Sequence, residues 1–230
     1  MPRRSKSTRA PAKSKKTKPQ IRTTGRGKAR KAAATAASGQ RALSASALSV
    51  HATNDRFNPI GYAKRRVRAI ADFPIPGILF RDITPVLADA RAFHAVIDAF
   101  VARFVSERLD AVVAIESRGF IFGAALAARL NVSFVPVRKP GKLPAAVDRV
   151  SYKLEYGKAE LEMHRDALAK GARVVVIDDL LATGGTAKAT SKLVKQRGAS
   201  VVAYAFVIEL TGLPGRAALG ATPVVSLIRY

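Results

Sequence analysis

Apolar and polar residues follow two alternating spacings along the chain from about residue 56 onward. Short runs of apolar β-formers predict strands at residues 111–115, 132–137, 174–177, 201–207 and 224–228. Segments with an apolar residue every three to four positions predict helices at residues 61–71, 93–109, 119–130 and 187–196. Residues 78–83 are predicted to be extended, and residues 139–161 to form a long hairpin or a loop.

Strands that alternate with helices of this length indicate a parallel sheet. We therefore expect an α/β fold, with a Rossmann-like, open, mostly parallel sheet and helices on both faces. In such sheets ligands bind beyond the carboxyl ends of the strands. Four charged residues fall at strand ends in this chain, namely Glu116, Arg138, Asp178 and Asp179.

The first 55 residues differ in composition from the rest. They contain fourteen Lys and Arg residues and one acid, in a chain with a formal net charge of +24. Such a segment does not bury enough apolar surface to offset its chain entropy, so we expect residues 1–55 to be a disordered basic tail and residues 56–230 one catalytic domain. A nucleic-acid-binding arm, a transit peptide, a solubilising leader and a misassigned start codon all stay open as origins of the tail.

Composition also argues against several classes of protein. No apolar run reaches the length of a membrane span, so no membrane association is expected. The chain has no cysteine, which excludes disulfides and thiolate chemistry and fits a reducing cytoplasm. The three histidines lack metal-ligand spacing, and neither a P-loop pattern nor a nucleophile-elbow motif is present.

The most informative string is residues 173–186. A run of apolar β-formers ends in two adjacent carboxylates, Asp178 and Asp179, and a loop of small residues opens the next helix. The backbone N–H groups of such a loop form an anion cradle, and the carboxylates suit the hydroxyls of a sugar attached to that anion. The string predicts a sugar-phosphate site rather than a plain capped turn. Its loop residues are Ala182, Thr183, Gly184, Gly185 and Thr186.

Two more loops fall at the same predicted edge. The string Glu116-Ser117-Arg118 follows one strand and opens a helix, which suits a second anion, although a capped turn with a surface salt bridge is the alternative. Three cations on a Pro/Gly loop follow the next strand and suit a polyphosphate, although exposed basic loops are common. These cations are Arg138, Lys139 and Lys142.

Together these motifs resemble the ribose-phosphate signature of the type I phosphoribosyltransferases. Over residues 60–230 the chain is similar to the adenine phosphoribosyltransferase family in particular. The most discriminating string is residues 73–84, FPIPGILFRDIT, because other phosphoribosyltransferases share the Asp-Asp loop but not this segment. The other matching strings are residues 116–120, 137–144, 154–157 and 178–186, whereas the basic tail has no counterpart in the family pattern.

The resemblance implies the type I phosphoribosyltransferase fold with a small N-terminal hood. It also implies a reaction in which adenine and phosphoribosyl pyrophosphate give AMP and pyrophosphate, as in purine salvage. Mg²⁺ would be carried by the pyrophosphate and ribose hydroxyls of the substrate rather than by protein ligands. Members of the family are usually homodimers.

Residue roles follow from the same resemblance. Asp178 and Asp179 would hold the ribose hydroxyls, and residues 182–186 the 5′-phosphate. Glu116, Ser117 and Arg118 would form a pyrophosphate loop with a strained peptide, which Arg138, Lys139 and Lys142 would approach. Adenine would lie between Phe80 and Leu210, with the backbone of Leu79 and Arg81 reading its edge. Glu155 and Arg118 would be the catalytic residues, Glu155 transferring a proton from a closing loop.

The sequence is also compatible with two other functions. One is a phosphoribosyltransferase-fold regulator that binds nucleic acid through its basic tail, although the tail lacks the pattern of a folded DNA-reading domain. The other is a phosphoribosyltransferase for a different purine, which fits the sugar-phosphate string but not residues 73–84.

Overall fold

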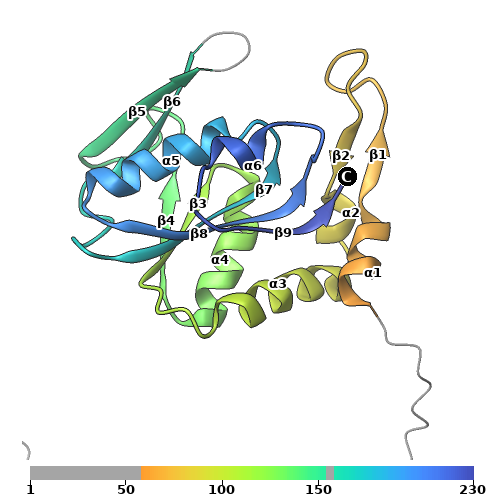
Figure 1. Ribbon diagram of the computed structural model, residues 1–230, viewed down its shortest axis with the longest axis horizontal. Coiled ribbons are helices and arrows are strands. Elements are labelled where there is room, and N and C mark those ends of the chain that lie inside the picture. Colours follow the sequence, from red (N-terminus) through yellow and green to blue (C-terminus); the bar gives the residue numbers. More distant parts are fainter. Residues whose placement is uncertain (1–57, 154–157) are drawn as a thin grey trace, which may run out of the picture. The chain divides into compact units, whose positions relative to one another are not determined.

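The computed structural model describes residues 58–153 and 158–230. In chain order the elements are α1 (Pro59–Arg66), β1 (Arg68–Ile70), β2 (Phe80–Asp82), α2 (Thr84–Leu87), α3 (Ala90–Phe104), β3 (Ala111–Ile115), α4 (Arg118–Leu130), β4 (Ser133–Val137), β5 (Val147–Lys153), β6 (Lys158–His164), β7 (Arg173–Leu181), α5 (Gly185–Gln196), β8 (Ser200–Glu209), α6 (Gly215–Ala218) and β9 (Val224–Arg229). The central sheet has five parallel strands in the order β4-β3-β7-β8-β9 (Figure 1).

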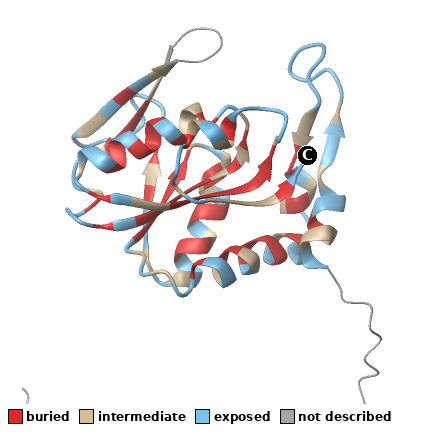
Figure 2. Ribbon diagram, viewed as in Figure 1, coloured by how far each residue is buried: buried red, intermediate tan, exposed pale blue. Residues whose placement is uncertain are grey.

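Helices cover both faces of this sheet, and successive strand residues point to opposite faces. Val113 of β3 packs on one side in a cluster that includes Leu193 of α5. Its neighbour Val112 packs on the other side with Phe100 of α3 and Phe122 of α4. Figure 2 shows the buried residues along the strands and along these three helices. The expected fold class, a mostly parallel sheet with helices on both faces, is confirmed.

The order of the strands determines where a ligand site forms. The chain passes from β3 outward to β4 and then returns to β7 on the opposite side of β3. This reversal leaves the loops after β3 and β7 diverging from one crevice, the usual position of a ligand in open α/β sheets. All residues of β3 are buried, which explains its uninterrupted apolar sequence.

Two antiparallel pairs flank the sheet. β1 pairs with β2, and β5 with β6. The two pairs are associated with opposite edges of the sheet. Helix α1, which precedes β1, contacts the edge strand β9, and β6 contacts the other edge strand, β4. The β1–β2 pair is the N-terminal hood that the resemblance implied, and the β5–β6 pair packs against α5.

The predicted helix over residues 61–71 is wrong in its second half. α1 ends at Arg66, and the next residues form β1, in which Arg68 faces Asp82 of β2. The Arg68 guanidinium donates to the Asp82 carboxylate at 2.6 Å. A local spacing of apolar residues does not report this long-range pairing, which decides the conformation.

Other boundaries also differ. The helix predicted at residues 93–109 runs from Ala90 to Phe104, because the Asp89 side chain caps it by accepting from the Ala92 N–H at 3.0 Å. Residues 139–161 contain β5 and the first part of β6, so the hairpin, one of the two predicted alternatives, is confirmed. Residues 1–57 and 154–157, with the tail and Glu155, lie outside the described residues. Within the described ranges, every helix is too short or too polar to span a membrane.

Candidate active site

The carboxyl end of β7 brings two adjacent acids to the crevice. The Asp179 side chain is only 5% exposed, and its backbone N–H donates to Oδ1 of Asp178 at 2.9 Å. Burial, with the adjacent Asp179 charge, raises the pKa of Asp178 well above its ordinary value. Burial also raises the pKa of Asp179, although Arg118 opposes the shift. Two adjacent acids at one strand end, of which Asp179 is buried and Asp178 partly buried, favour polar ligands such as hydroxyl groups.

The loop after β7 encloses a cavity of about 80 Å³. Gly184 lies at the N-cap of α5 with φ +78°, a conformation that glycine adopts without strain. It offers no side chain to the first N–H groups of the helix, which therefore suit an external anion. The residues that line the cavity are Asp178, Leu180, Leu181, Ala182, Thr183, Gly184, Thr186, Ala187 and Phe206.

A close approach of two backbones supports this loop from behind. A Cβ atom on Gly215 of α6 would overlap the carbonyl oxygen of Ala182, and one on Gly184 would lie 2.7 Å from the carbonyl oxygen of Gly215. The buried Glu209 holds α6 in place, because it accepts from Arg216 at 2.6 and 2.8 Å. Hydrogen bonds from Arg216 lower the pKa of Glu209 to about 2.

The loop after β3 lies next to the acids. Its Glu116–Ser117 peptide bond is cis, and α4 begins at the following residue, Arg118. A Cβ atom on Gly119 would lie 2.9 Å from Oδ1 of Asp178. The first turn of α4 therefore packs directly on the end of β7, which only a residue without a side chain permits.

Arg118 connects three parts of the site. Its Nε lies 3.0 Å from Oδ2 of Asp179, and its guanidinium carbon lies 5.7 Å from the centre of the Phe80 ring. Phe80 belongs to the hood and also packs edge-on against Phe73, with ring centres 5.0 Å apart. One cation thus lies between the acids of β7 and the aromatic residue of the hood.

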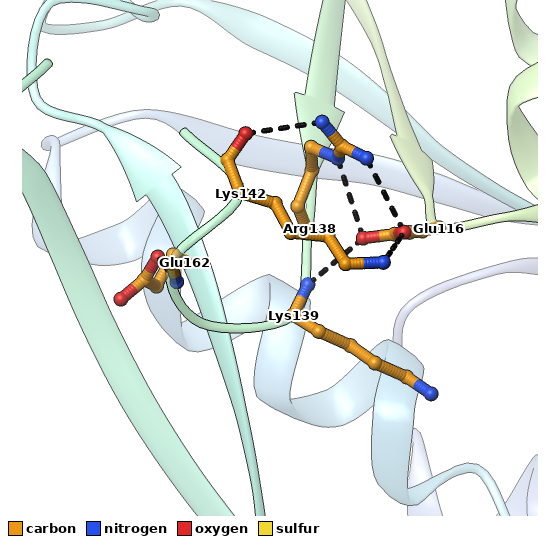
Figure 3. Close-up of polar contacts among 6 residues, drawn as sticks. Glu116, Arg138, Lys139, Lys142 and Glu162 are labelled. Carbon is orange, nitrogen blue, oxygen red and sulfur yellow. Dashed lines mark hydrogen bonds and ion pairs between the residues drawn. The ribbon is translucent and has the colours of Figure 1, made fainter. Parts of the chain in front are cut away.

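The cationic loop after β4 is organised around Glu116 (Figure 3). The Glu116 carboxylate accepts from the Arg138 guanidinium at 3.3 Å, from the Lys139 N–H at 3.1 Å and from Lys142 Nζ at 2.6 Å. Burial opposes its ionisation, but the hydrogen bonds from Lys142 and Arg138 outweigh burial and lower the pKa of Glu116 to about 2. The carboxylate is therefore a charged anchor for these cations.

The remaining residues of the expected adenine site lie on two elements. Leu79 in the hood is half exposed, and the guanidinium of Arg81 stacks on the Tyr230 ring at 3.8 Å. The Arg81 side chain is thus engaged by Tyr230, and Arg81 faces Ala69 of β1 in the β1–β2 pair. Leu210 follows β8, and its N–H donates to the Leu181 carbonyl at 3.0 Å.

The structure brings the expected ribose, phosphate and pyrophosphate residues to the crevice, and the Phe80–Arg118 contact brings the hood to it. Glu155 lies outside the described residues, so its placement is not tested. In the described ranges no group of three or more His, Asp or Glu side chains is arranged to hold a metal. Sequence reasoning missed Gly215, Glu209 and Glu162, which support the loops from behind and carry no motif of their own.

Comparison with known proteins identifies relatives of this arrangement. The phosphoribosyl transferase domain family matches residues 86–216. Adenine phosphoribosyltransferase from Sorangium cellulosum is 59% identical over 174 residues, which cover 74% of this chain and 87% of that protein. The corresponding protein from Roseiflexus sp. is 59% identical over 164 residues, 71% of this chain and 95% of that protein.

Solved structures give the same result. The crystal structure of adenine phosphoribosyltransferase from Thermoanaerobacter pseudethanolicus matches with a TM-score of 0.73 and 50% identity, over 74% of this chain and 99% of that chain. The enzyme from Saccharomyces cerevisiae, crystallised with adenine and an imino-altritol bisphosphate, matches with a TM-score of 0.70 and 41% identity, over 74% and 98% of the two chains.

Proposed function

The chain belongs to the phosphoribosyltransferase family, and within it to the adenine phosphoribosyltransferases; we propose that it transfers a phosphoribosyl group from phosphoribosyl pyrophosphate to adenine, giving AMP and pyrophosphate. The position of Arg118 carries this proposal. Its contacts with Asp179 and Phe80 join a sugar-binding acid pair to an aromatic residue suited to a base. Transfer to a base requires the sugar and the base to be bound side by side, so that a bond can form between them.

The sugar phosphate occupies the end of β7 in this proposal. Asp178 and Asp179 accept from the ribose hydroxyls, and the loop of residues 182–186 donates its N–H groups to the 5′-phosphate. The cavity enclosed by that loop and the dipole of the twelve-residue helix α5 support the assignment. Holding the ribose at its hydroxyls and at its 5′-phosphate orients the reacting carbon, C1′, between the pyrophosphate and adenine subsites.

Pyrophosphate leaves toward the loops after β3 and β4. Residues Ser117 and Arg118 and the cations Arg138, Lys139 and Lys142 approach it, while Glu116 keeps the cations together in its absence. Mg²⁺ bound to the substrate supplies further positive charge for the leaving group. Two carboxylates alone do not complete the coordination of Mg²⁺. The acid pair of β7 therefore fits a Mg²⁺ ion that is already bound to the substrate.

The bond from C1′ to pyrophosphate breaks while N9 of adenine bonds to C1′ from the opposite face. Adenine lies between Phe80 and Leu210, and backbone groups near Leu79 and Arg81 read its edge. A site that pairs with N1 and the 6-amino group leaves buried groups unpaired against a 6-oxo purine, which costs about 1–3 kcal/mol per group. Glu155 takes part in proton transfer, and its loop excludes water that would hydrolyse the activated ribose.

We further propose a cytoplasmic homodimer, in line with the family pattern and a chain without cysteine. The residues that bind adenine and phosphoribosyl pyrophosphate are all assigned within residues 79–210. Nucleic-acid binding through residues 1–55 is a separate proposal, based on their fourteen basic residues.

The decisive experiment measures pyrophosphate release from phosphoribosyl pyrophosphate with adenine, hypoxanthine and guanine in parallel. We expect turnover with adenine and kcat/KM values at least about tenfold lower with the two 6-oxo purines. Equal turnover of guanine would overturn the specificity. If no base supports pyrophosphate release, the alternative function, a phosphoribosyltransferase-fold regulator that binds nucleic acid, would be favoured.

A further inference from the structure

The loop of residues 138–142 is held between two carboxylates that belong to different elements. Glu116, after β3, binds its side chains and the Lys139 N–H. Glu162 of β6 lies on the other side of the loop (Figure 3). The proposed reaction assigns no role to Glu162, although it is one of the most deeply buried charged residues in the described part of the chain, with 2% exposure.

Both oxygens of the Glu162 carboxylate have donors. Oε2 accepts from the Gly141 N–H at 3.0 Å. Oε1 accepts from Arg149 Nε at 2.9 Å and from a second nitrogen of the same guanidinium. Arg149 comes from the neighbouring strand β5, where it faces Glu162 directly in the register. The arginine therefore fixes one oxygen and leaves the other directed at the loop.

The backbone of Glu162 binds the start of the same loop. The Arg138 N–H donates to the Glu162 carbonyl at 3.0 Å, and the Glu162 N–H donates to the Arg138 carbonyl at 2.8 Å. Glu162 thus contacts the loop at its first residue through the backbone and at Gly141 through the side chain. These two attachments fix both the start of the loop and its turn.

The turn itself needs such support. Gly141 has φ +76°, and among the described residues a Cβ atom there would have no neighbour within 4 Å. In the part of the chain that the structure describes, no side chain packs against this residue to define the turn. A buried carboxylate that loses a donor pays a large desolvation penalty, so movement of Gly141 away from Glu162 is unfavourable.

We propose that Glu162 is a positioning residue, which holds the 138–142 loop in the conformation that presents Arg138, Lys139 and Lys142 to pyrophosphate. This inference rests on the proposed function. It goes beyond that function in assigning the geometry of the pyrophosphate subsite to a buried residue of the β5–β6 hairpin that does not itself touch the substrate.

The test compares Glu162→Gln with Glu160→Gln in the full-length protein. Glu160 lies on the same strand, accepts from the same Arg149 at 3.4 Å and also from Ser151, so its variant removes the same charge beside the same arginine. We expect Glu162→Gln to raise KM for phosphoribosyl pyrophosphate about 10- to 100-fold. The KM for adenine should stay within about threefold, and Glu160→Gln should match the wild type.

Direct binding separates a positioning role from a purely structural one. Isothermal titration with inorganic pyrophosphate should show a weaker Kd for Glu162→Gln by a similar factor, and unchanged binding by Glu160→Gln. A variant with a lower Tm but wild-type KM and pyrophosphate affinity would overturn the inference, because Glu162 would then only stabilise the hairpin. A uniform change in both KM values would overturn it as well.

The wild-type protein provides a test that needs no variant to fold. The Gly141 amide should exchange with solvent more slowly than a random-coil glycine when followed by NMR. Exchange at the random-coil rate would overturn the inference. A wild-type protein that binds pyrophosphate but shows no adenine-dependent turnover would instead overturn the proposed function, and the binding comparison would still decide the role of Glu162.

Discussion

Arg118 Nε lies 3.0 Å from Oδ2 of Asp179, which ties the first residue of α4 to the carboxyl end of β7. The two partners differ in burial, since the Asp179 side chain is 5% exposed and that of Arg118 is 40% exposed. The arginine therefore compensates a buried charge with one face and presents another face to the hood, where it meets the Phe80 ring. The acid pair and the hood are linked through this one side chain.

Replacing Asp179 should separate substrate binding from folding. Asp179→Ala removes an acceptor for a ribose hydroxyl and the partner of Arg118. We expect kcat/KM to fall at least about 100-fold, since each hydrogen bond to a charged group contributes roughly 10- to 100-fold. Steady-state pyrophosphate release measures this, with circular dichroism to show that the fold persists.

Asp98→Ala is the matched control for that variant. Asp98 also pairs with an arginine, Arg129, at 2.9 Å, but its side chain is 58% exposed. Exposed ion pairs contribute little, so this variant should keep wild-type kinetics. Wild-type kinetics in a folded Asp179→Ala protein would show instead that the acid has only a structural role.

The anchor of the cationic loop should make stability depend on pH. The pKa of Glu116 is lowered from 4.5 to about 2 in the folded protein. A lowered pKa means that the unfolded chain binds more protons in this range, so the stabilisation is present above pH 4.5 and is lost as the pH falls toward 2. Glu116→Gln should therefore be less stable than the wild type near neutral pH, by at most about 3 kcal/mol, and the difference should shrink in acid.

Denaturant titrations at several pH values would measure this difference. Glu107→Gln is the control, because Glu107 forms a surface pair with Arg103 at 3.0 Å and should contribute little at any pH. A difference between Glu116→Gln and the wild type that does not change with pH would contradict the prediction.

The support behind the phosphate loop gives a steric prediction. Gly215→Ala would force a methyl group against the Ala182 carbonyl and within 2.9 Å of the Leu181 side chain. We expect destabilisation of about 1–3 kcal/mol and a raised KM for phosphoribosyl pyrophosphate, because the loop must shift. Thermal unfolding and initial rates would measure both. Gly212→Ala should be neutral, since a Cβ atom there meets no described residue within 4 Å. Equal behaviour of the two variants would count against a packed loop.

The sequence predicted those parts of the protein that depend on local pattern. The apolar runs that became β3 and β7 are buried on both faces of the sheet, so their composition reports their environment directly. The acids and small residues at residues 178–186 likewise form a contiguous string. Their chemistry could be inferred before any contact was known.

The supporting residues could not be predicted in this way. Glu162 lies in β6 between Leu161 and Met163, which are both buried, and alternation would place it on the solvent face. It is buried because the 138–142 loop, distant in sequence, covers it. The close contact of Gly215 with Ala182 and the pairing of Arg68 with Asp82 are long-range relationships of the same kind. A single sequence contains no period or motif that reports them.

Glu155 tests the chemical step, and this prediction rests on the family resemblance because the residue lies outside the described ranges. Glu155→Gln keeps size and hydrogen bonding but removes the carboxylate. Loss of general acid–base help costs about 10²–10⁴-fold in rate, so kcat should fall by that factor. Affinity for phosphoribosyl pyrophosphate, measured by titration, should change little. An unchanged kcat would show that Glu155 takes no part in proton transfer.

Removing residues 2–55 should leave adenine turnover nearly intact. The segment contains almost no large apolar residues in its first 40 positions, and every residue assigned to the site lies between Leu79 and Leu210. If the tail binds nucleic acid, the same deletion should abolish a salt-dependent interaction, in which each neutralised phosphate of duplex DNA adds about 0.9 to the log–log slope. Activity assays and DNA titrations at several salt concentrations measure the two effects.

Two outcomes would contradict these expectations. Loss of activity on truncation would move the domain boundary into the tail. A full-length protein that does not bind DNA or RNA at low salt would favour a targeting leader or a misassigned start.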